Sequence, residues 1–271
     1  TVHHGKINKN MTEHKLMTKE ERHAAILERL MQFESVQVTD LASLLNVSLV
    51  TIRKDLTELE KANKLYRSHG KAILINPYAT NRNVNDKEKL YTAEKRNIGR
   101  EAALLIERDD TIILASGTTV HALARAIKPV HKLTLITASI VVSNLVSQEE
   151  NIDIIQLGGM LRHSSQSVVG RRAERYLDDV ACSKLFLGVD GIDFDFGITT
   201  TDMREAELNQ AMMHTSQKTI VLADSSKFGR RGFSKIANLD DIDIIITDAG
   251  IPQSAVARIE ELGIELIIAK P

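Results

Sequence analysis

The sequence predicts a small winged helix-turn-helix domain followed by an α/β domain with a mostly parallel sheet. Two observations carry this prediction. Before residue 62, three stretches space their apolar residues as helices do, and a hairpin-like pattern follows them, which is the order of a winged helix-turn-helix. After residue 86, short runs rich in Ile, Val and Leu alternate with helical patterns, as in α/β proteins.

Composition and length are those of an ordinary globular chain. The 271 residues are 43% hydrophobic and 26% charged, enough for two domains. No run approaches the roughly 18 apolar residues of a membrane helix, and the polar N-terminus lacks a signal-peptide core, so we expect a cytoplasmic protein outside the membrane. The single cysteine, Cys182, is interpreted as a buried small apolar residue. With a net charge of −1, affinity for a polyanion must come from a local patch.

Changes in composition divide the chain into four parts. Residues 1–17 are predicted to be a polar tail, and residues 18–75 the winged helix-turn-helix domain. Residues 76–93 hold a turn-prone linker and the start of a connecting helix, and residues 94–271 form the α/β domain. The connecting helix is expected from about Lys87 to Ile106. Its solvent face is expected to carry the charged residues Lys87, Glu88, Glu94, Lys95 and Arg96.

The first domain is assigned element by element. The stretch KEERHAAILERLMQF predicts the first helix, and VTDLASLLNV predicts the second, with Thr39 as its candidate N-cap. Ser48 is the candidate cap of a third helix in NVSLVTIRKDL. The residues expected to hold this helix against the first two are Val50, Ile52, Leu56 and Leu59. Two short strand-like pieces about Gly70 follow in KLYRSHGKAILI.

The third helix of a winged helix-turn-helix enters the DNA major groove, which explains the polar cluster near its start. Arginine can bind guanine through two hydrogen bonds, hydroxyl groups can donate to bases or phosphates, and lysine neutralises phosphate. The candidate DNA-binding residues are Ser48, Thr51, Arg53 and Lys54 on the helix, and Arg67, His69 and Lys71 on the wing. Residues 53–71 hold six Lys or Arg against three acids. This charge balance alone is equally compatible with a solvated helical bundle that contacts other proteins.

A longer pattern is more specific than the charge. The positions that match the DNA-binding signature of the DeoR-type transcriptional regulators, in identity and spacing, are Arg22, Ile26, Leu30, Ser48, Thr51, Ile52, Arg53, Lys54, Asp55 and Leu56. The N-terminal part therefore resembles this family. The resemblance implies that Thr51, Arg53 and Lys54 lie on the recognition helix, that operator DNA is a partner, and that the protein is a homodimer or homotetramer. Asp55 is expected to hold Arg53 or Lys54 in place.

Seven apolar runs predict the strands of the second domain: TIILA, LTLITA, IDIIQLG, KLFLGVDG, TIVLAD, DIIITDAG and IELIIA. Open α/β sheets bind ligands at the carboxyl ends of their strands, so polar residues after these runs are candidates for a site. Ser116 to Thr119 end the first run and open a helix. Backbone N–H groups, hydroxyls and the helix dipole there suit phosphate, although a plain capped turn explains the same residues.

Three further elements follow strand-like runs in the same way. A glycine pair follows the third run, paired carboxylates follow the fourth, and a lysine follows the fifth. The carboxylates could do acid/base work or accept hydrogen bonds from sugar hydroxyls. The candidate effector-binding residues are Ser116, Gly117, Thr118, Thr119, Gly158, Gly159, Asp190, Gly191, Asp193, Thr199, Thr200, Glu205 and Lys227. No metal and no cofactor is expected.

From about Glu94 to the C-terminus, the chain resembles the sensor domain of the same DeoR-type family, most closely in GVDGID and ADSSKFGRR. That sensor is similar in fold to ribose-5-phosphate isomerase and the CoA transferases, and the family's usual inducers are phosphorylated sugars. The resemblance implies a repressor of a sugar-catabolic operon that a phosphorylated sugar modulates. The family usually has Asp before the SGTT stretch and Asn in the next strand-end turn, where this chain has Ala115 and Ala138.

The alternative is a sugar-phosphate isomerase-like enzyme with an accessory DNA-binding domain. Isomerisation needs a base to move a proton and a cation to stabilise the enediolate. In the resembling isomerases a lysine follows the paired acids, whereas this chain reads Phe196-Gly197-Ile198-Thr199 at that place. We therefore expect binding without catalysis.

Overall fold

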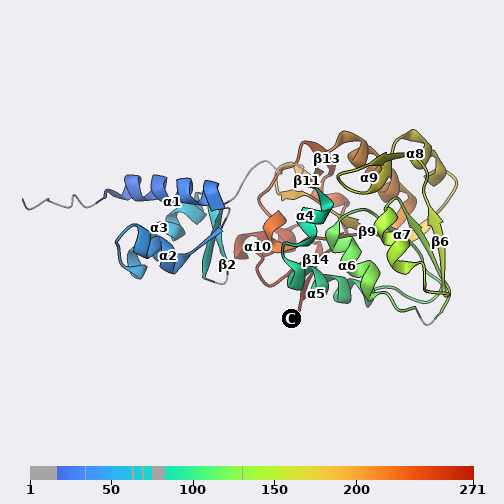
Figure 1. Ribbon diagram of the computed structural model, residues 1–271, viewed down its shortest axis with the longest axis horizontal. Coiled ribbons are helices and arrows are strands. Elements are labelled where there is room, and N and C mark those ends of the chain that lie inside the picture. The colour runs from blue at the N-terminus through green and yellow to red at the C-terminus, as the bar shows by residue number, and fades with distance from the viewer. Residues whose placement is uncertain (1–16, 34, 63, 69, 75–82, 130) are drawn as a thin grey trace, which may run out of the picture. The chain divides into compact units, whose positions relative to one another are not determined.

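The computed structural model describes residues 17–33, 35–62, 64–68, 70–74, 83–129 and 131–271 (Figure 1). The chain splits into two compact units, of which the first ends at Leu74. His69, nearly all of the predicted tail and most of the predicted linker lie outside the described residues.

The first unit is a winged helix-turn-helix, as predicted. Its helices are α1 (Lys19–Phe33), α2 (Val38–Leu44) and α3 (Leu49–Lys61), and its strands are β1 (Ser35–Gln37), β2 (Leu65–Ser68) and β3 (Lys71–Leu74). The strands form an antiparallel sheet in the order β1-β3-β2. The sequence did not predict β1. The pairing of β1 with β3 sets the start of α2. Thr39 is therefore not the N-cap: α2 begins at Val38, whose N–H donates to the carbonyl oxygen of Gly70 at 2.9 Å.

Buried residues of all three helices and of the wing form the core of this unit. Its largest fully buried side chains are Ile26, Leu30, Leu41, Ile52, Leu56 and Leu65. The prediction that Val50 packs in this core is wrong, because Val50 is 74% exposed. Ile52, Leu56 and Leu59 follow one another at helical spacing, and a residue two positions before Ile52 lies on the opposite side of α3.

A buried ion pair ties α1 to α3. Asp55 is 2% exposed and accepts hydrogen bonds from Nε and Nη2 of Arg22 at 2.7 and 3.0 Å. The prediction that Asp55 holds Arg53 or Lys54 is wrong, because Asp55 faces α1 whereas both of those side chains are exposed. Although burial opposes ionisation, the Arg22 guanidinium holds the pKa of Asp55 below its usual value.

The second unit is built on a parallel sheet of seven strands. These are β4 (Thr111–Leu114), β5 (Leu133–Thr137), β6 (Ile152–Gln156), β9 (Cys182–Gly188), β12 (Ser216–Leu222), β14 (Ile244–Asp248) and β15 (Glu265–Ala269). Their order in the sheet is β15-β14-β12-β9-β4-β5-β6, and each neighbouring pair is parallel. The chain starts at β4, moves outward to β6, and returns to the other side of β4 with β9. This reversal is the topological switch point of a doubly wound sheet.

Helices cover both faces of this sheet (Figure 1). One face is covered by α5 (Thr92–Ala103), α6 (Thr118–Ala126) and α7 (Ile140–Val146), and the other by α8 (Arg171–Leu177), α9 (Met203–Thr215) and α10 (Gln253–Glu261). Alternate strand residues divide between the two cores. Ile112 and Leu114 of β4 pack with the first helices, and Ile113 packs with the second.

Smaller elements are inserted after the carboxyl ends of the edge strand β6 and the inner strands β9 and β12. The hairpin of β7 (Met160–Arg162) and β8 (Ser167–Val169) follows β6. An antiparallel sheet joins β10 (Gly191–Asp193), β11 (Gly197–Thr200) and β13 (Ser234–Ala237), which come after β9 and β12. The 3₁₀ turns span Ser225–Lys227 and Leu239–Asp241. These insertions place polar residues at one edge of the sheet.

The predicted connecting helix is broken into α4 (Val84–Glu88) and α5. The break lies before Tyr91, whose φ of 54° is left-handed. Lys95, predicted to face solvent, is 4% exposed instead, because its Nζ donates to the carbonyl oxygens of Lys87 and Leu90 at 2.6 and 2.7 Å. The ammonium group thus adds a charged donor to the carbonyl oxygens that follow α4, of which that of Lys87 also accepts from the Leu90 N–H at 3.2 Å. Burial lowers the pKa of Lys95 to about 8.

Two further features of the described residues concern membrane spans and the single thiol. None of the helices in the described ranges has the length and apolar character needed to cross a bilayer. Cys182 is buried, as predicted, and burial raises the pKa of its thiol to about 11. A thiol with this pKa stays protonated at neutral pH and is a poor nucleophile.

Replacing Arg22 with Met should destabilise the first unit by roughly 3–5 kcal/mol, because the buried carboxylate of Asp55 loses its main partner. Hydrogen exchange of the α1 and α3 amides in the full chain measures the loss. The double variant R22M/D55L should recover most of the protection, since it removes the charge together with its partner. A loss below about 1 kcal/mol in R22M would show that Asp55 does not depend on this ion pair.

Candidate functional site

One side of α3 carries polar and apolar side chains that do not pack in the core. Arg53 and Lys54 are exposed, and the exposed Val50 lies one turn before them on the same helix. Guanidinium, ammonium and a small apolar group are the chemistries that bind guanine, phosphate and the thymine methyl group. Sequence reasoning missed Val50, although the spacing of Ile52 and Leu56 already places it off the core face.

The start of α3 is fixed by its cap. Ser48 is the N-cap, and its Oγ accepts a hydrogen bond from the Thr51 N–H at 3.1 Å. The two hydroxyls are 2.9 Å apart, so Ser48 and Thr51 hold each other. Both predicted residues therefore order the helix end whose dipole favours phosphate.

The predicted wing residues differ in their surroundings. Arg67 is bound by Glu60, whose Oε2 accepts from Nε and Nη2 of Arg67 at 2.9 and 2.6 Å. Lys71 is exposed on β3. His69 lies outside the described residues. Of the two described wing residues, Lys71 is therefore exposed to solvent, whereas Arg67 is paired with Glu60.

A cleft in the second unit lies at the carboxyl ends of β4, β9 and β12, which are neighbours at the switch point. It is lined by Val84, Lys87, Ser116, Gly117, Thr118, Thr119, Arg162, Ser164, Ser165, Gly188, Val189, Asp190, Thr200, Glu205, Asn209 and Lys227. Ligands of open α/β sheets bind at this place. The lining is dominated by hydroxyl, ammonium, guanidinium and carboxylate groups.

Glycines let the ends of β4 and β9 approach each other. Gly117, the residue before α6, has a φ of 120°, which side-chain-bearing residues rarely adopt. A Cβ on Gly188 would lie 2.9 Å from the carbonyl oxygen of Ser116. The N–H groups of the first turn of α6 have no acceptor inside their helix and lie at its positive end. The turn can therefore bind an anion.

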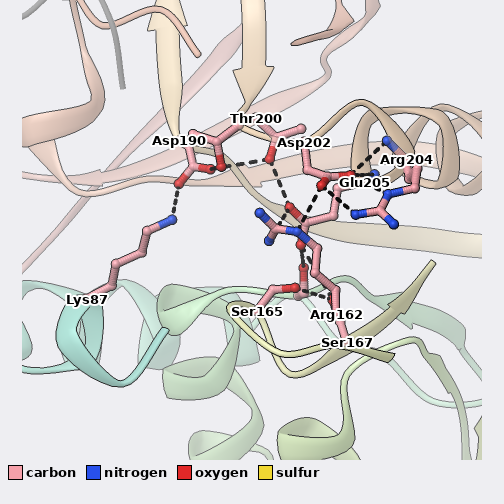
Figure 2. Close-up of polar contacts among 11 residues, drawn as sticks. Lys87, Arg162, Ser165, Ser167, Asp190, Thr200, Asp202, Arg204 and Glu205 are labelled. Carbon is pink, nitrogen blue, oxygen red and sulfur yellow. Dashed lines mark hydrogen bonds and ion pairs between the residues drawn. The ribbon is translucent and has the colours of Figure 1, made fainter. Parts of the chain in front are cut away.

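Asp190 follows β9 and forms one half of the polar network in the cleft (Figure 2). Its carboxylate accepts a hydrogen bond from Lys87 Nζ at 2.5 Å and from the hydroxyls of Thr200 and Thr201 at 3.3 Å each. Burial opposes its ionisation, but the ammonium groups of Lys87 and Lys227 hold the pKa of Asp190 below its usual value. Asp190 is thus an anionic acceptor at neutral pH.

Glu205 forms the other half, in the first turn of α9, and is 7% exposed. It accepts from Arg162 Nη1 and Thr200 Oγ1, each at 3.2 Å, and Arg162 also donates to Asp202. The Thr200 hydroxyl reaches both Glu205 and Asp190 (Figure 2), yet it has a single proton to donate. The two carboxylates are therefore linked through one hydroxyl.

The cleft brings together eight of the residues predicted for effector binding. They are Ser116, Gly117, Thr118, Thr119, Asp190, Thr200, Glu205 and Lys227. Segments separated by more than a hundred residues supply them, all at the carboxyl edge of the sheet. Ala115 and Ala138 are buried in the core beneath this edge.

Five predicted residues do not line the cleft: Gly158, Gly159, Gly191, Asp193 and Thr199. A Cβ on Gly159 would lie 2.8 Å from the carbonyl oxygen of Val169, and one on Gly191 would lie 2.4 Å from that of Arg230, so both glycines permit close backbone packing. A Cβ on Gly158 would meet no atom within 4 Å.

The other two residues of this group support the β10–β11 sheet. Asp193 accepts hydrogen bonds from Arg231 Nη2 at 3.0 Å and from the backbone N–H of Phe196 at 2.8 Å. Thr199 Oγ1 donates to the carbonyl oxygen of Gly191 and accepts from the N–H of Gly232 at 2.7 Å. Their polar atoms are engaged within this structure.

Five charged or polar cleft residues escaped the sequence interpretation: Lys87, Arg162, Ser164, Ser165 and Asn209. Arg162 ends the stretch QLGGMLR, in which the glycine pair was the predicted feature. Lys87 was assigned to a solvent face. No sequence signal was available for either contact, because hairpin β7–β8 and helix α4 reach the cleft only through tertiary packing.

His121 is a fully buried residue of α6 close to this edge of the sheet. Its Nε2 lies 3.4 Å from Oγ of Ser139, the N-cap of α7. Burial lowers the pKa of His121 to about 4. Within the described residues, no group of three or more His, Cys, Asp or Glu side chains is arranged to hold a metal ion.

Comparison with known families matches both units. Residues 22–78 match the DeoR-like helix-turn-helix domain, and residues 91–249 match the DeoR C-terminal sensor domain. Residues 79–90 lie between the two matches. The matched segments contain α3 with its exposed side chains and most of the cleft.

Relatives extend over nearly the whole chain. The putative aga operon transcriptional repressor of Escherichia coli O157:H7 is 39% identical over 92% of this chain and 93% of its own length. The HTH-type transcriptional repressor GlcR of Bacillus subtilis strain 168 is 34% identical over 94% of this chain and 98% of its own. Both are named as repressors and neither as an enzyme, in agreement with the prediction of a regulator.

Solved structures give a more distant likeness. A D-ribose-5-phosphate isomerase in complex with phospho-erythronic acid aligns with 62% of this chain and 64% of its own. The sequences are 19% identical in this alignment, and the TM-score is 0.36.

Acidification should destabilise the second unit through His121. In the folded protein the pKa of His121 is about 4, below the ordinary 6.5. Between pH 6.5 and 4 the histidine binds a proton in the unfolded chain but not in the folded one, so the free energy of unfolding falls as the pH drops through this range. Urea unfolding at a series of pH values should show a loss on the order of 2–3 kcal/mol.

Variants identify the group responsible. His121→Leu should flatten the pH dependence over this range, whereas His131→Gln, a change at an exposed histidine, should leave it intact. The same acid-induced loss in H121L and in the wild type would contradict the assignment to His121.

Proposed function

Because the chain belongs to the DeoR family of transcriptional regulators, we propose that it represses a sugar-catabolic operon and that a phosphorylated sugar modulates its binding to double-stranded operator DNA. The observation that carries the effector half of this proposal is the cleft at the switch point. It combines an anion-binding helix turn with cations and with carboxylates that accept hydrogen bonds from hydroxyls. A phosphorylated sugar offers both a dianion and hydroxyl donors.

The sugar phosphate is proposed to lie along the cleft. Its phosphate would meet the N–H groups and hydroxyls at Gly117 to Thr119, with Lys227 neutralising charge. Its hydroxyls would donate to Asp190 and Glu205. The assignment is supported by the position of all these groups in one cleft and by the lowered pKa of Asp190, which keeps that carboxylate an acceptor.

The first unit is proposed to bind the operator with α3 in the major groove. Arg53 would bind guanine through its fork of N–H groups, Val50 would contact a thymine methyl, and Lys54 and Lys71 would bind phosphates. Residues 18–75 would form this DNA-binding domain. Residues 76–93 would join it to an effector-sensing domain over residues 94–271.

Regulation is proposed to act through an oligomer. A homodimer or homotetramer would present α3 helices to the half-sites of a two-fold symmetric operator. In one arrangement of the oligomer, the α3 helices would no longer match both half-sites. A ligand that binds this arrangement more tightly would shift the population toward it and release the protein from the operator.

Replacing Arg53 with Ala should weaken binding to an operator selected from random DNA by about 1–3 kcal/mol and relax base preference at the contacted position. Lys71→Ala should weaken all sequences similarly and reduce the salt dependence of binding, since lysine contacts phosphate. Fluorescence anisotropy with specific and scrambled duplexes measures both. Equal, small losses for the two variants on both duplexes would exclude direct base recognition by Arg53.

Phosphorylated sugars should raise the thermal stability of the purified protein, and their unphosphorylated counterparts should not. A ligand at 100 times its dissociation constant stabilises the folded state by roughly 2.7 kcal/mol. The panel should include ribose 5-phosphate and glucose 6-phosphate with ribose and glucose.

The Lys227→Ala variant should lose this stabilisation, because Lys227 lines the cleft. The matched control Lys218→Ala changes an exposed lysine of β12 and should keep it. Equal shifts with ribose and ribose 5-phosphate would contradict the proposed phosphate site.

A further inference from the structure

The cleft is completed by a segment outside both family matches. Val84 and Lys87 line it, and both belong to α4, a single helical turn between residues 79 and 90. The remaining lining comes from the matched sensor domain. The site therefore includes a short helix that begins soon after the first unit ends at Leu74.

Contacts at both ends and one across the cleft hold α4 in place, in addition to an ion pair of Glu88 with Arg125 of α6 and a hydrogen bond from Gln166 to Asn85. Val84 is buried, and its N–H donates to the carbonyl oxygen of Ser164 at 2.7 Å. Asn83 caps the helix by accepting from the Asn85 N–H. At the other end, the Lys95 ammonium donates hydrogen bonds to the carbonyl oxygens of Lys87 and Leu90. The side-chain contact that crosses the cleft is the ion pair of Lys87 with Asp190 (Figure 2).

This ion pair stands where a ligand would have to bind. The cavity volume in the cleft is only about 50 Å³, whereas pockets for small-molecule ligands measure roughly 300–1,000 Å³. Lys87 Nζ is 2.5 Å from Oδ1 of Asp190, so the carboxylate proposed to accept hydrogen bonds from ligand hydroxyls already has a charged donor. A ligand hydroxyl that donates to Oδ1 of Asp190 therefore competes with Lys87 for that oxygen.

We propose that Lys87 is the residue through which the cleft regulates DNA binding: ligand hydroxyls displace its ammonium from Asp190 and release α4. This inference rests on the proposed function, because it needs a ligand in the cleft. Release changes the anchorage of the chain at Val84, the first residue of α4, soon after the first unit ends at Leu74. The bistable element is α4, and ligand and Lys87 bias it in opposite directions.

Hydrogen exchange of the full-length protein tests the anchorage. Lys87→Met keeps the length of the side chain and removes its charge, and it should speed the exchange of amides 84–90 roughly tenfold through loss of the charged hydrogen bond. Lys89→Met, at an exposed lysine two residues on, should leave exchange unchanged. Unchanged exchange in K87M would overturn the inference, because the ion pair would not hold α4.

The ligand arm uses ribose 5-phosphate and glucose 6-phosphate at millimolar concentration. Whichever compound stabilises the wild type should also speed exchange of amides 84–90, and K87M should bind it several-fold more tightly because no ion pair has to break. Stabilisation with unchanged or slower exchange of α4 would overturn the inference while the proposed function stands. If neither compound stabilises the wild type, the proposed function fails and this inference fails with it.

Discussion

The close approach of β4 and β9 at their carboxyl ends is the constraint on which the second unit depends. Strand order reverses between these neighbours, so the segments that leave them diverge and open a cleft. Gly188 leaves room for the carbonyl oxygen of Ser116, and Gly117 turns the chain into α6. The positive end of α6 and the carboxylate of Asp190 then face the same space. A side chain at Gly188 would push apart the two strands that define it.

Most of the fold could be predicted because the inner strands are buried on both faces and all seven strands appear as apolar runs. Each of the seven runs became a strand of the central sheet. The failures lie where tertiary contacts override local pattern. Strand β1 is only three residues long and exists through its pairing with β3. The connecting helix breaks because Tyr91 adopts a left-handed conformation, and Lys95 is buried because it binds carbonyl oxygens beside that break.

The candidate site could be predicted only in part, for a related reason. Residues directly after a strand can be placed at the sheet edge from sequence, which located Ser116 to Thr119 and Asp190. Arg162 and Lys87 reach the same cleft from a hairpin and a short helix whose packing leaves no local signal. Asp55 shows the converse error. Its sequence neighbours Arg53 and Lys54 suggested a partner, but helical geometry directs it to Arg22 instead.

Thr200 gives the cleft an imbalance of donors and acceptors. Its single hydroxyl proton serves two carboxylates, so at any moment one of Asp190 and Glu205 lacks that hydrogen bond. A guest hydroxyl can donate to whichever carboxylate lacks the Thr200 proton, and Thr200 then donates to the other. A guest with such a hydroxyl fixes the direction of the Thr200 proton, whereas one that offers only ether or carbonyl oxygens cannot.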